Sequence, residues 1–182
     1  MGDLFMEIKA QGTLNYETVK ASLHVTIYKK TKPKKAVILR LLFTALAMAF
    51  CIFNMVAFGF SSYMLLSFFA MLLGGFIFIY MYFLLPKIRF KAMGKMQNVT
   101  NNYVFTDNAI ICSSSTDGYE GKAEVNYSVI CKVIETSQYM LIYQTSNNFY
   151  ILEKATVSGG SVDDLRRKLF SFLGENYVIY SY

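Results

Sequence analysis

The longest stretch without an ionisable side chain constrains this chain more than any other feature. Residues 41–86 contain no Asp, Glu, Lys, Arg or His, although charged residues make up 16% of the 182 residues and apolar residues 54%. No soluble core of this size needs so long an uncharged stretch. The stretch therefore excludes a simple soluble enzyme, a disordered chain, a coiled coil and a disulfide scaffold.

The uncharged stretch belongs to two apolar runs, residues 37–58 and 63–85, which are joined by the turn-forming residues 59–62. As helices the runs would be about 33–35 Å long, enough for a hydrocarbon core of about 30 Å. The short link predicts an antiparallel transmembrane hairpin. Because proline cannot extend helical hydrogen bonding, we expect Pro86 to end the second helix.

Two basic clusters flank the hairpin on the side of the chain termini. Together they are called the basic collar: Lys29, Lys30, Lys32, Lys34, Lys35, Arg40, Lys87, Arg89, Lys91 and Lys95. The positive-inside rule then predicts a multi-pass protein of the plasma (inner) membrane with both termini in the cytoplasm. Attraction to anionic headgroups is worth about 1 kcal/mol per basic residue. The lipid bilayer, not nucleic acid, is the partner that the net charge of +6 indicates.

A second interpretation of the collar is selective capture of one anionic lipid. The first interpretation is favoured because the charge lies where topology alone requires it.

Small residues predict how the two spans pack. Ala45 and Ala49 are four apart on one span, and Ala70 and Gly74 are four apart on the other, which is spacing that lets helix backbones approach closely. A pore would need ionisable groups at membrane depth, and the spans offer only uncharged polar residues such as Asn54. The hairpin is therefore interpreted as an anchor.

The remaining segments predict a cytoplasmic α+β fold. A strand over residues 4–10 and a helix over 16–28 precede the hairpin. Short alternating segments between residues 103 and 152 predict an antiparallel β meander. A helix over 161–173 follows, with Ser161 and Asp164 in a Ser-x-x-Asp start and an apolar stripe that would cover the meander. The predicted division is an arm (1–35), the hairpin (36–86), a basic linker (87–102) and a β-rich domain (103–182).

Several strand motifs resemble a known family. They are Tyr103-Val-Phe-Thr-Asp-Asn-Ala-Ile, Val129-Ile-Cys-Lys-Val-Ile-Glu-Thr, Tyr139-Met-Leu-Ile-Tyr and Tyr150-Ile-Leu-Glu-Lys. In this order the chain resembles the YcxB-like family of small bacterial membrane proteins, which usually have Ile-Leu-Pro-Lys at the last motif. The resemblance implies a membrane-tethered domain similar to a pleckstrin-homology barrel. It implies no established activity and no functional residues to transfer.

The ionisable residues do not form a recognisable catalytic motif. His24, the only histidine, has no Cys or carboxylate at metal-ligand spacing, and Cys112 and Cys131 are interpreted as reduced, small core residues. Glu135 is unusual because it ends an apolar strand, and a salt bridge to Lys154 or Lys132 is the favoured explanation. The prediction is a non-enzymatic protein without a cofactor, a metal site or catalytic residues.

Three functions are compatible with these features. The favoured one is an interaction module whose sheet edge or C-terminal helix groove binds a protein or peptide partner at the membrane. The alternative is a small transport or pore component made from oligomerised hairpins, with Asn54 lining the path. A lipid-modifying enzyme is the least favoured. Partner identity and oligomeric state do not follow from the sequence.

Overall fold

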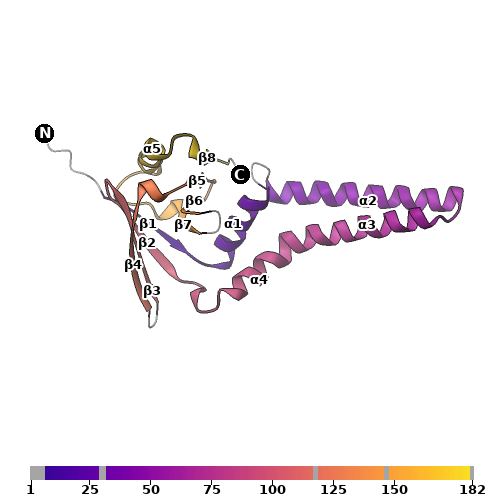
Figure 1. Cartoon of the computed structure of the whole chain (residues 1–182), viewed down its shortest axis with the longest axis horizontal. Coiled ribbons are helices and arrows are strands. Elements are labelled where there is room, and N and C mark those ends of the chain that lie inside the picture. The colour runs from indigo at the N-terminus through magenta and orange to yellow at the C-terminus, as the bar shows by residue number, and fades with distance from the viewer. Residues whose placement is uncertain (1–6, 29–31, 117–118, 146–147, 181–182) are drawn as a thin grey trace. The chain divides into compact units, whose positions relative to one another are not determined.

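The chain folds into two compact units. The computed structural model describes residues 7–28, 32–116, 119–145 and 148–180. The β-rich unit comprises Met1–Ser22 and Met93–Tyr182, and the helical unit comprises Leu23–Ala92 (Figure 1). The predicted mixture of two long apolar helices with antiparallel sheets is confirmed.

The first sheet combines one strand that precedes the long helices in the sequence with three strands that follow them. Its order is β1 (Ile8–Thr13), β2 (Thr100–Phe105), β3 (Ala109–Thr116) and β4 (Tyr119–Asn126), with every neighbouring pair antiparallel. In β1 the burial alternates between buried and exposed, as a strand with one covered face requires. The strand expected over 4–10 therefore lies further along the chain, and residues 4–6 are outside the described residues.

The second sheet has the order β7-β6-β5-β8. Three of its strands, β5 (Lys132–Glu135), β6 (Tyr139–Tyr143) and β7 (Phe149–Glu153), continue the predicted antiparallel meander. The fourth, β8 (Tyr177–Ile179), pairs in parallel with β5 and was not predicted. Parallel pairing becomes possible because a helix carries the chain back across the sheet after β7.

Strand β1 connects the two sheets along one edge. On the side away from β2, the backbone of Lys9 exchanges two hydrogen bonds of 2.8 Å with Ser158, and Gln11 N–H donates to Thr156 Oγ1. At Gly12 the approach is so close that a Cβ atom would lie 1.8 Å from the carbonyl oxygen of Ile151 in β7. Only glycine fits this crossing.

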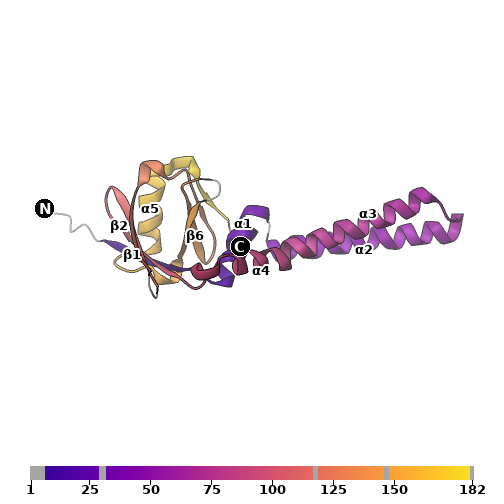
Figure 2. The same cartoon turned by 60° about the horizontal axis from the view of Figure 1, so that its bottom comes forward.

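Helix α5 (Val162–Leu173) completes the core of the β-rich unit. Figure 2 shows it lying between strands of the first sheet and strands of the second. Its apolar stripe, Leu165, Leu169 and Leu173, is buried against residues from both sheets, among them Phe105, Ile110, Val133, Met140 and Ile142. The predicted N-terminal capping box is confirmed, because Ser161 and Asp164 hydrogen-bond each other's backbone N–H groups.

The helical unit contains the two predicted apolar helices. After α1 (Tyr16–Tyr28), α2 (Pro33–Phe58) and α3 (Ser62–Ile79) run side by side (Figures 1 and 2). By length and composition Pro33–Phe58 and the continuous helical segment Ser62–Ala92 are each able to cross a membrane. Their outward side chains are large and apolar, including Phe43, Phe50, Phe53 and Val56.

The second long helix does not end at Pro86, contrary to the prediction. A π-helical turn, η1 (Tyr80–Leu84), precedes it, and α4 (Leu85–Ala92) continues beyond it. Pro86 lacks the N–H group that would bond the carbonyl of Tyr82, four residues earlier. The wider turn accommodates the proline ring, and His24 Nε2 lies 3.4 Å from the Tyr82 carbonyl oxygen. A tertiary contact therefore occupies the carbonyl that the proline leaves without its helical partner.

The contact between α2 and α3 does not use the predicted small residues. Ala45, Ala49 and Ala70 are exposed, and a Cβ atom at Gly74 would meet no other atom within 4 Å. The helices instead meet at two other places. Gly75 lies close to the side chain of Thr44, and Cys51 Sγ donates a hydrogen bond to the Met64 carbonyl at 3.3 Å. On α3 the glycine that faces α2 is therefore Gly75, one residue after the predicted Gly74.

Candidate functional site

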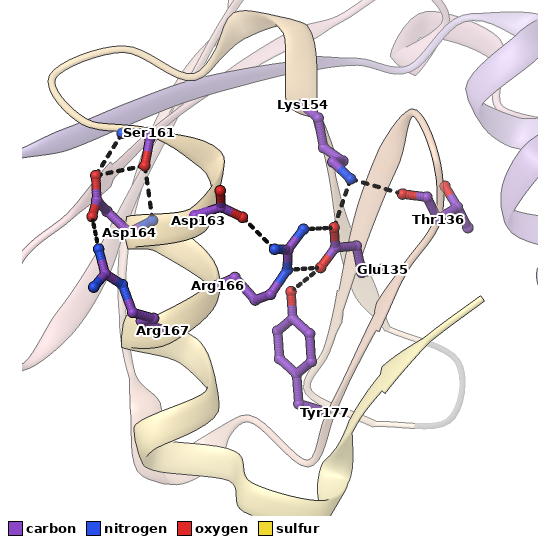
Figure 3. Close-up of polar contacts among 9 residues, drawn as sticks. All are labelled: Glu135, Thr136, Lys154, Ser161, Asp163, Asp164, Arg166, Arg167 and Tyr177. Atoms are coloured by element: carbon purple, nitrogen blue, oxygen red, sulfur yellow. Dashed lines mark hydrogen bonds and ion pairs between the residues drawn. The ribbon is translucent and has the colours of Figure 1, made fainter. Parts of the chain in front are cut away.

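Ionisable side chains converge on Glu135, which lies at the end of β5. Lys154 Nζ donates to Glu135 Oε1 at 2.6 Å and to the Thr136 carbonyl at 3.1 Å. Arg166 donates from Nη2 to Oε1 at 2.7 Å and from Nε to Oε2 at 2.8 Å, and Tyr177 OH donates to Oε2 at 2.6 Å (Figure 3). These four residues, Glu135, Lys154, Arg166 and Tyr177, are called the Glu135 cluster.

Each member reaches the cluster from a different element. Glu135 belongs to β5, Lys154 follows β7, Arg166 is on α5, and Tyr177 begins β8. The backbone contributes as well, because Tyr180 N–H donates to the Glu135 carbonyl at 2.7 Å. The cluster therefore connects α5, β8 and the end of β7 to one residue of the second sheet.

The electrostatics of the cluster keep Glu135 ionised. Burial by itself raises the pKa of this carboxyl, since Glu135 is 1% exposed, but hydrogen bonds from Arg166, Lys154 and Tyr177 outweigh burial and lower the pKa to about 2. Burial and the hydrogen bond to Glu135 raise the pKa of the Tyr177 hydroxyl. The hydrogen bond to Glu135 likewise raises the pKa of Arg166.

This arrangement holds charges in place instead of moving protons. Each carboxylate oxygen already accepts two hydrogen bonds, so both oxygens are fully engaged. A general acid or base needs a pKa near the working pH, and Glu135 is far below it. The role that this geometry supports is structural: the cluster attaches α5 and β8 to the second sheet.

The predicted salt bridge from Glu135 to Lys154 is confirmed, and Lys132, the other predicted partner, is not a member of the cluster. Arg166 and Tyr177 were missed by the sequence reasoning. They lie 31 and 42 residues from Glu135, and no local pattern relates residues so far apart. In the sequence, Arg166 was marked only by its place beside the apolar stripe of the helix, and Tyr177 had no such mark.

Aromatic side chains on α5 form an exposed apolar feature of the β-rich unit. Phe170 is 56% exposed and Phe172 is 51% exposed, on either side of the buried leucine stripe. Phe172 stacks on Tyr127 with ring centroids 4.3 Å apart, and Phe170 meets the ring of Tyr177 edge to face. Ile179, in the edge strand β8, is 57% exposed.

The described residues of the basic collar are all exposed: Lys32, Lys34, Lys35, Arg40, Lys87, Arg89, Lys91 and Lys95. Lys29 and Lys30 lie outside the described residues. Within the described part of the chain, Lys34, Lys35, Lys87 and Arg89 form no ion pair with a carboxylate, in agreement with the absence of acids from residues 18–106.

The remaining reactive residues occupy packed or separate positions. His24 is buried and stacks on Tyr82, with ring centroids 4.6 Å apart. Cys112 is buried in β3, whereas Cys131 is exposed and immediately precedes β5 of the other sheet. Among the described residues, no three potential metal-ligating side chains come together.

The geometry of the β-rich unit can be compared with known families. Residues 105–169 match the family model described as YcxB-like protein. The predicted resemblance is therefore confirmed over these residues. The YcxB-like segment runs from the end of β2 into α5 and contains Glu135, Lys154 and Arg166. No curated protein and no solved structure gave a significant match to the chain.

Proposed function

We propose that this chain is a membrane-anchored, non-enzymatic protein whose cytoplasmic, pleckstrin-homology-like domain binds a protein or peptide partner at the inner membrane of a bacterium. The observation that carries the proposal is the pair of half-exposed aromatic residues on α5, Phe170 and Phe172, together with the edge strand β8, whose Tyr177 contacts the ring of Phe170. Large aromatic residues are typical anchors of protein interfaces, and an edge strand offers unpaired backbone groups to an extended peptide.

The composition of the helical unit supports the anchor. Its long helices expose large apolar side chains, which is unfavourable in water and favourable in lipid. The polar side chains within them bond to helix backbone: Thr44 Oγ1 donates to the Arg40 carbonyl, and Ser67 Oγ donates to the Tyr63 carbonyl. In a hydrocarbon environment there is no water, so polar groups need hydrogen-bond partners within the protein.

The strand order supports the pleckstrin-homology-like assignment. A four-stranded antiparallel sheet is followed by three antiparallel strands and then by a helix that packs on their shared core. In this domain the apolar helices are inserted between the first and second strands. The YcxB-like match covers the part that follows the insertion.

The pore alternative has no specific observation in its favour. Asn54 Nδ2 donates to the Phe50 carbonyl of its own helix at 2.8 Å. An amide engaged in this way gives no indication of a polar path, so the anchor remains the proposed role of the hairpin.

Site-specific photocrosslinking in intact cells tests the partner proposal. A photoreactive phenylalanine at position 172 of the full chain is expected to give one discrete adduct, and the same group at the exposed position Glu124 in β4 should give none. A second substitution, Phe170→Asp, should abolish the adduct without altering membrane extraction. Equal adducts at both positions, or none at 172, would contradict the proposed surface.

A further inference from the structure

Arg40 is the one arginine of the described chain that lies over aromatic rings. Its guanidinium carbon is 5.7 Å from the ring centroid of Tyr28 and 5.2 Å from that of Phe78. Both distances are within the range of cation–π attraction. Tyr28 belongs to α1 and Phe78 to α3, so three helices of the helical unit fix the position of one cation.

Among the described residues, no carboxylate pairs with this cation. Residues 18–106 contain neither Asp nor Glu, and no described side chain or carbonyl accepts a hydrogen bond from the Arg40 guanidinium. The arginines of α5 differ, because Arg166 pairs with Glu135 and Asp163, and Arg167 pairs with Asp164. Arg40 thus keeps its N–H donors available for a partner from outside the chain.

The depth of Arg40 in α2 specifies what that partner is. It lies seven residues after Pro33, about 10 Å along the helix axis, between the exposed side chains of Leu39 and Leu42. On the proposed membrane anchor this is the level at which the acyl chains meet the headgroups. The anion present there is the lipid phosphate, and a guanidinium binds phosphate oxygens with two parallel hydrogen bonds.

We propose that Arg40, positioned by the rings of Tyr28 and Phe78, binds the phosphate of an anionic phospholipid in the cytoplasmic leaflet. This inference rests on the proposed membrane anchor. It goes beyond general attraction to the basic collar, because it assigns lipid selectivity to one side chain. Lys34 and Lys35, exposed one to two turns earlier in α2, add net positive charge that favours anionic over zwitterionic lipids.

Lipid selectivity of the full chain in bilayers tests the site. The chain is reconstituted in phosphatidylcholine nanodiscs with spin-labelled phosphatidylglycerol or spin-labelled phosphatidylcholine, and the motionally restricted fraction of each label is measured. Both lipids carry a phosphate, but the choline ammonium of phosphatidylcholine neutralises its own phosphate, whereas the phosphate of phosphatidylglycerol has no such counter-ion. The wild-type chain should therefore prefer phosphatidylglycerol by about tenfold, which is the order of free energy of one charge-assisted hydrogen bond. Arg40→Gln should reduce the preference several-fold, to the smaller preference that the remaining basic residues of the collar provide.

Two variants separate a built site from surface charge. Arg89→Gln removes an exposed arginine that has no described ring contact, and its preference should stay within about twofold of wild type. Phe78→Leu leaves every charge in place but removes a positioning ring, and it should lower the preference several-fold. Equal losses in Arg40→Gln and Arg89→Gln, or full selectivity in Arg40→Gln, would overturn the proposal.

Two further measurements distinguish the remaining outcomes. Inorganic phosphate at about 10 mM should not displace the labelled lipid, and displacement would assign the site to a soluble phosphate instead. Extraction with alkaline carbonate reports membrane insertion independently of selectivity. A chain that inserts but shows no preference disproves only the lipid site, whereas a chain that is extracted disproves the anchor and the site together.

Discussion

At the scale of single residues, the β-rich unit depends on one buried carboxylate. Glu135 replaces the hydration of its two oxygens with four hydrogen bonds from Lys154, Arg166 and Tyr177. Removing one member of such a group leaves its partners without compensation, and this costs more than the intact group contributes. The residue that ends β5 therefore controls the attachment of α5 and β8.

Glu135→Gln should lower the free energy of unfolding of the β-rich unit by about 3 kcal/mol, because Lys154 and Arg166 lose their shared anion. Hydrogen exchange of β5 and β6 peptides in the full chain, followed by mass spectrometry, should accelerate about 100-fold. Glu124→Gln, the same change at an exposed strand position, is the control and should shift stability by less than about 0.5 kcal/mol. Equal protection in the two variants would show that the cluster is dispensable.

The low pKa of Glu135 predicts acid sensitivity. In the unfolded chain the carboxyl has its ordinary pKa of 4.5, and in the folded chain its pKa is about 2. Acid therefore protonates the unfolded state first, so the stabilisation is complete above pH 4.5 and is lost as the pH falls toward 2. Wild-type exchange protection of β5 should decline across this window more steeply than that of Glu135→Gln. Parallel declines would assign the acid sensitivity to other groups. One such group is Asp164, because hydrogen bonds from Ser161 lower the pKa of its carboxyl to about 2.

At the scale of elements, β1 is a strand with no free edge. It pairs with β2 on one side and bonds to Ser158 and Thr156 on the other. Glu153 also joins this contact, because its Oε1 accepts from Thr13 N–H at 3.3 Å. This glutamate occupies the position at which proline was expected from the family resemblance, and its carboxylate helps to hold β1 beside the end of β7.

Gly12→Ala tests the crossing of β1 and β7. The added Cβ atom would collide with the carbonyl oxygen of Ile151, which belongs to backbone and cannot swing aside. We expect a loss of about 3 kcal/mol, the upper part of the range for overpacking, and faster hydrogen exchange in β1 and β7. Gly74→Ala, where the new atom meets nothing within 4 Å, should leave both strands protected. Unchanged exchange in Gly12→Ala would show that the strands can separate freely.

Local patterns predicted some elements well and others poorly. Helix α1 matches the predicted residues 16–28, and α5 begins at the predicted cap, since the periodicity and the Ser161–Asp164 pair are contained in one short segment. Strand β8 has only three residues, too few for a clear alternating pattern. It is defined by its pairing with a strand more than forty residues earlier, which no local pattern shows. The end of α4 was missed for a different reason: η1 changes the helix geometry around Pro86, and the sequence shows only the proline.

The candidate site was predictable to the same extent. Glu135 attracted attention because an acid at the end of an apolar strand requires a partner, and Lys154 was one of two cations considered. Arg166 and Tyr177 reach it only through the tertiary arrangement of α5 and β8. The two rings beside Arg40 come from two other helices, α1 and α3, so no pattern along the chain relates them to Arg40.

At the scale of the whole molecule, the distribution of charge predicts on which side of a membrane each part of the chain would lie. The link between α2 and α3 has no charged residue, whereas the collar surrounds the other ends of both helices. With the proposed anchor, the positive-inside rule places the link outside the cytoplasm and the β-rich unit inside it.

Single cysteines check this topology in a background without Cys51, Cys112 and Cys131. Ser62→Cys, at the start of α3, should react with a membrane-impermeant maleimide in intact cells. Ser128→Cys, exposed in the β-rich unit, should react only after the cells are opened. The reverse pattern would contradict the predicted orientation, and equal reaction of both in intact cells would contradict a spanning hairpin.

The pairing of β1 with β2 has a consequence for synthesis on the ribosome. Thr13 and Thr100 are 87 residues apart, and the whole hairpin is translated between them. On the proposed membrane anchor, the nascent β1 would keep both of its edges unsatisfied while the apolar helices enter the membrane. The first sheet would assemble only after β2 has been translated, so a chain that stalls at the translocon would expose a strand without its partner to proteases and chaperones.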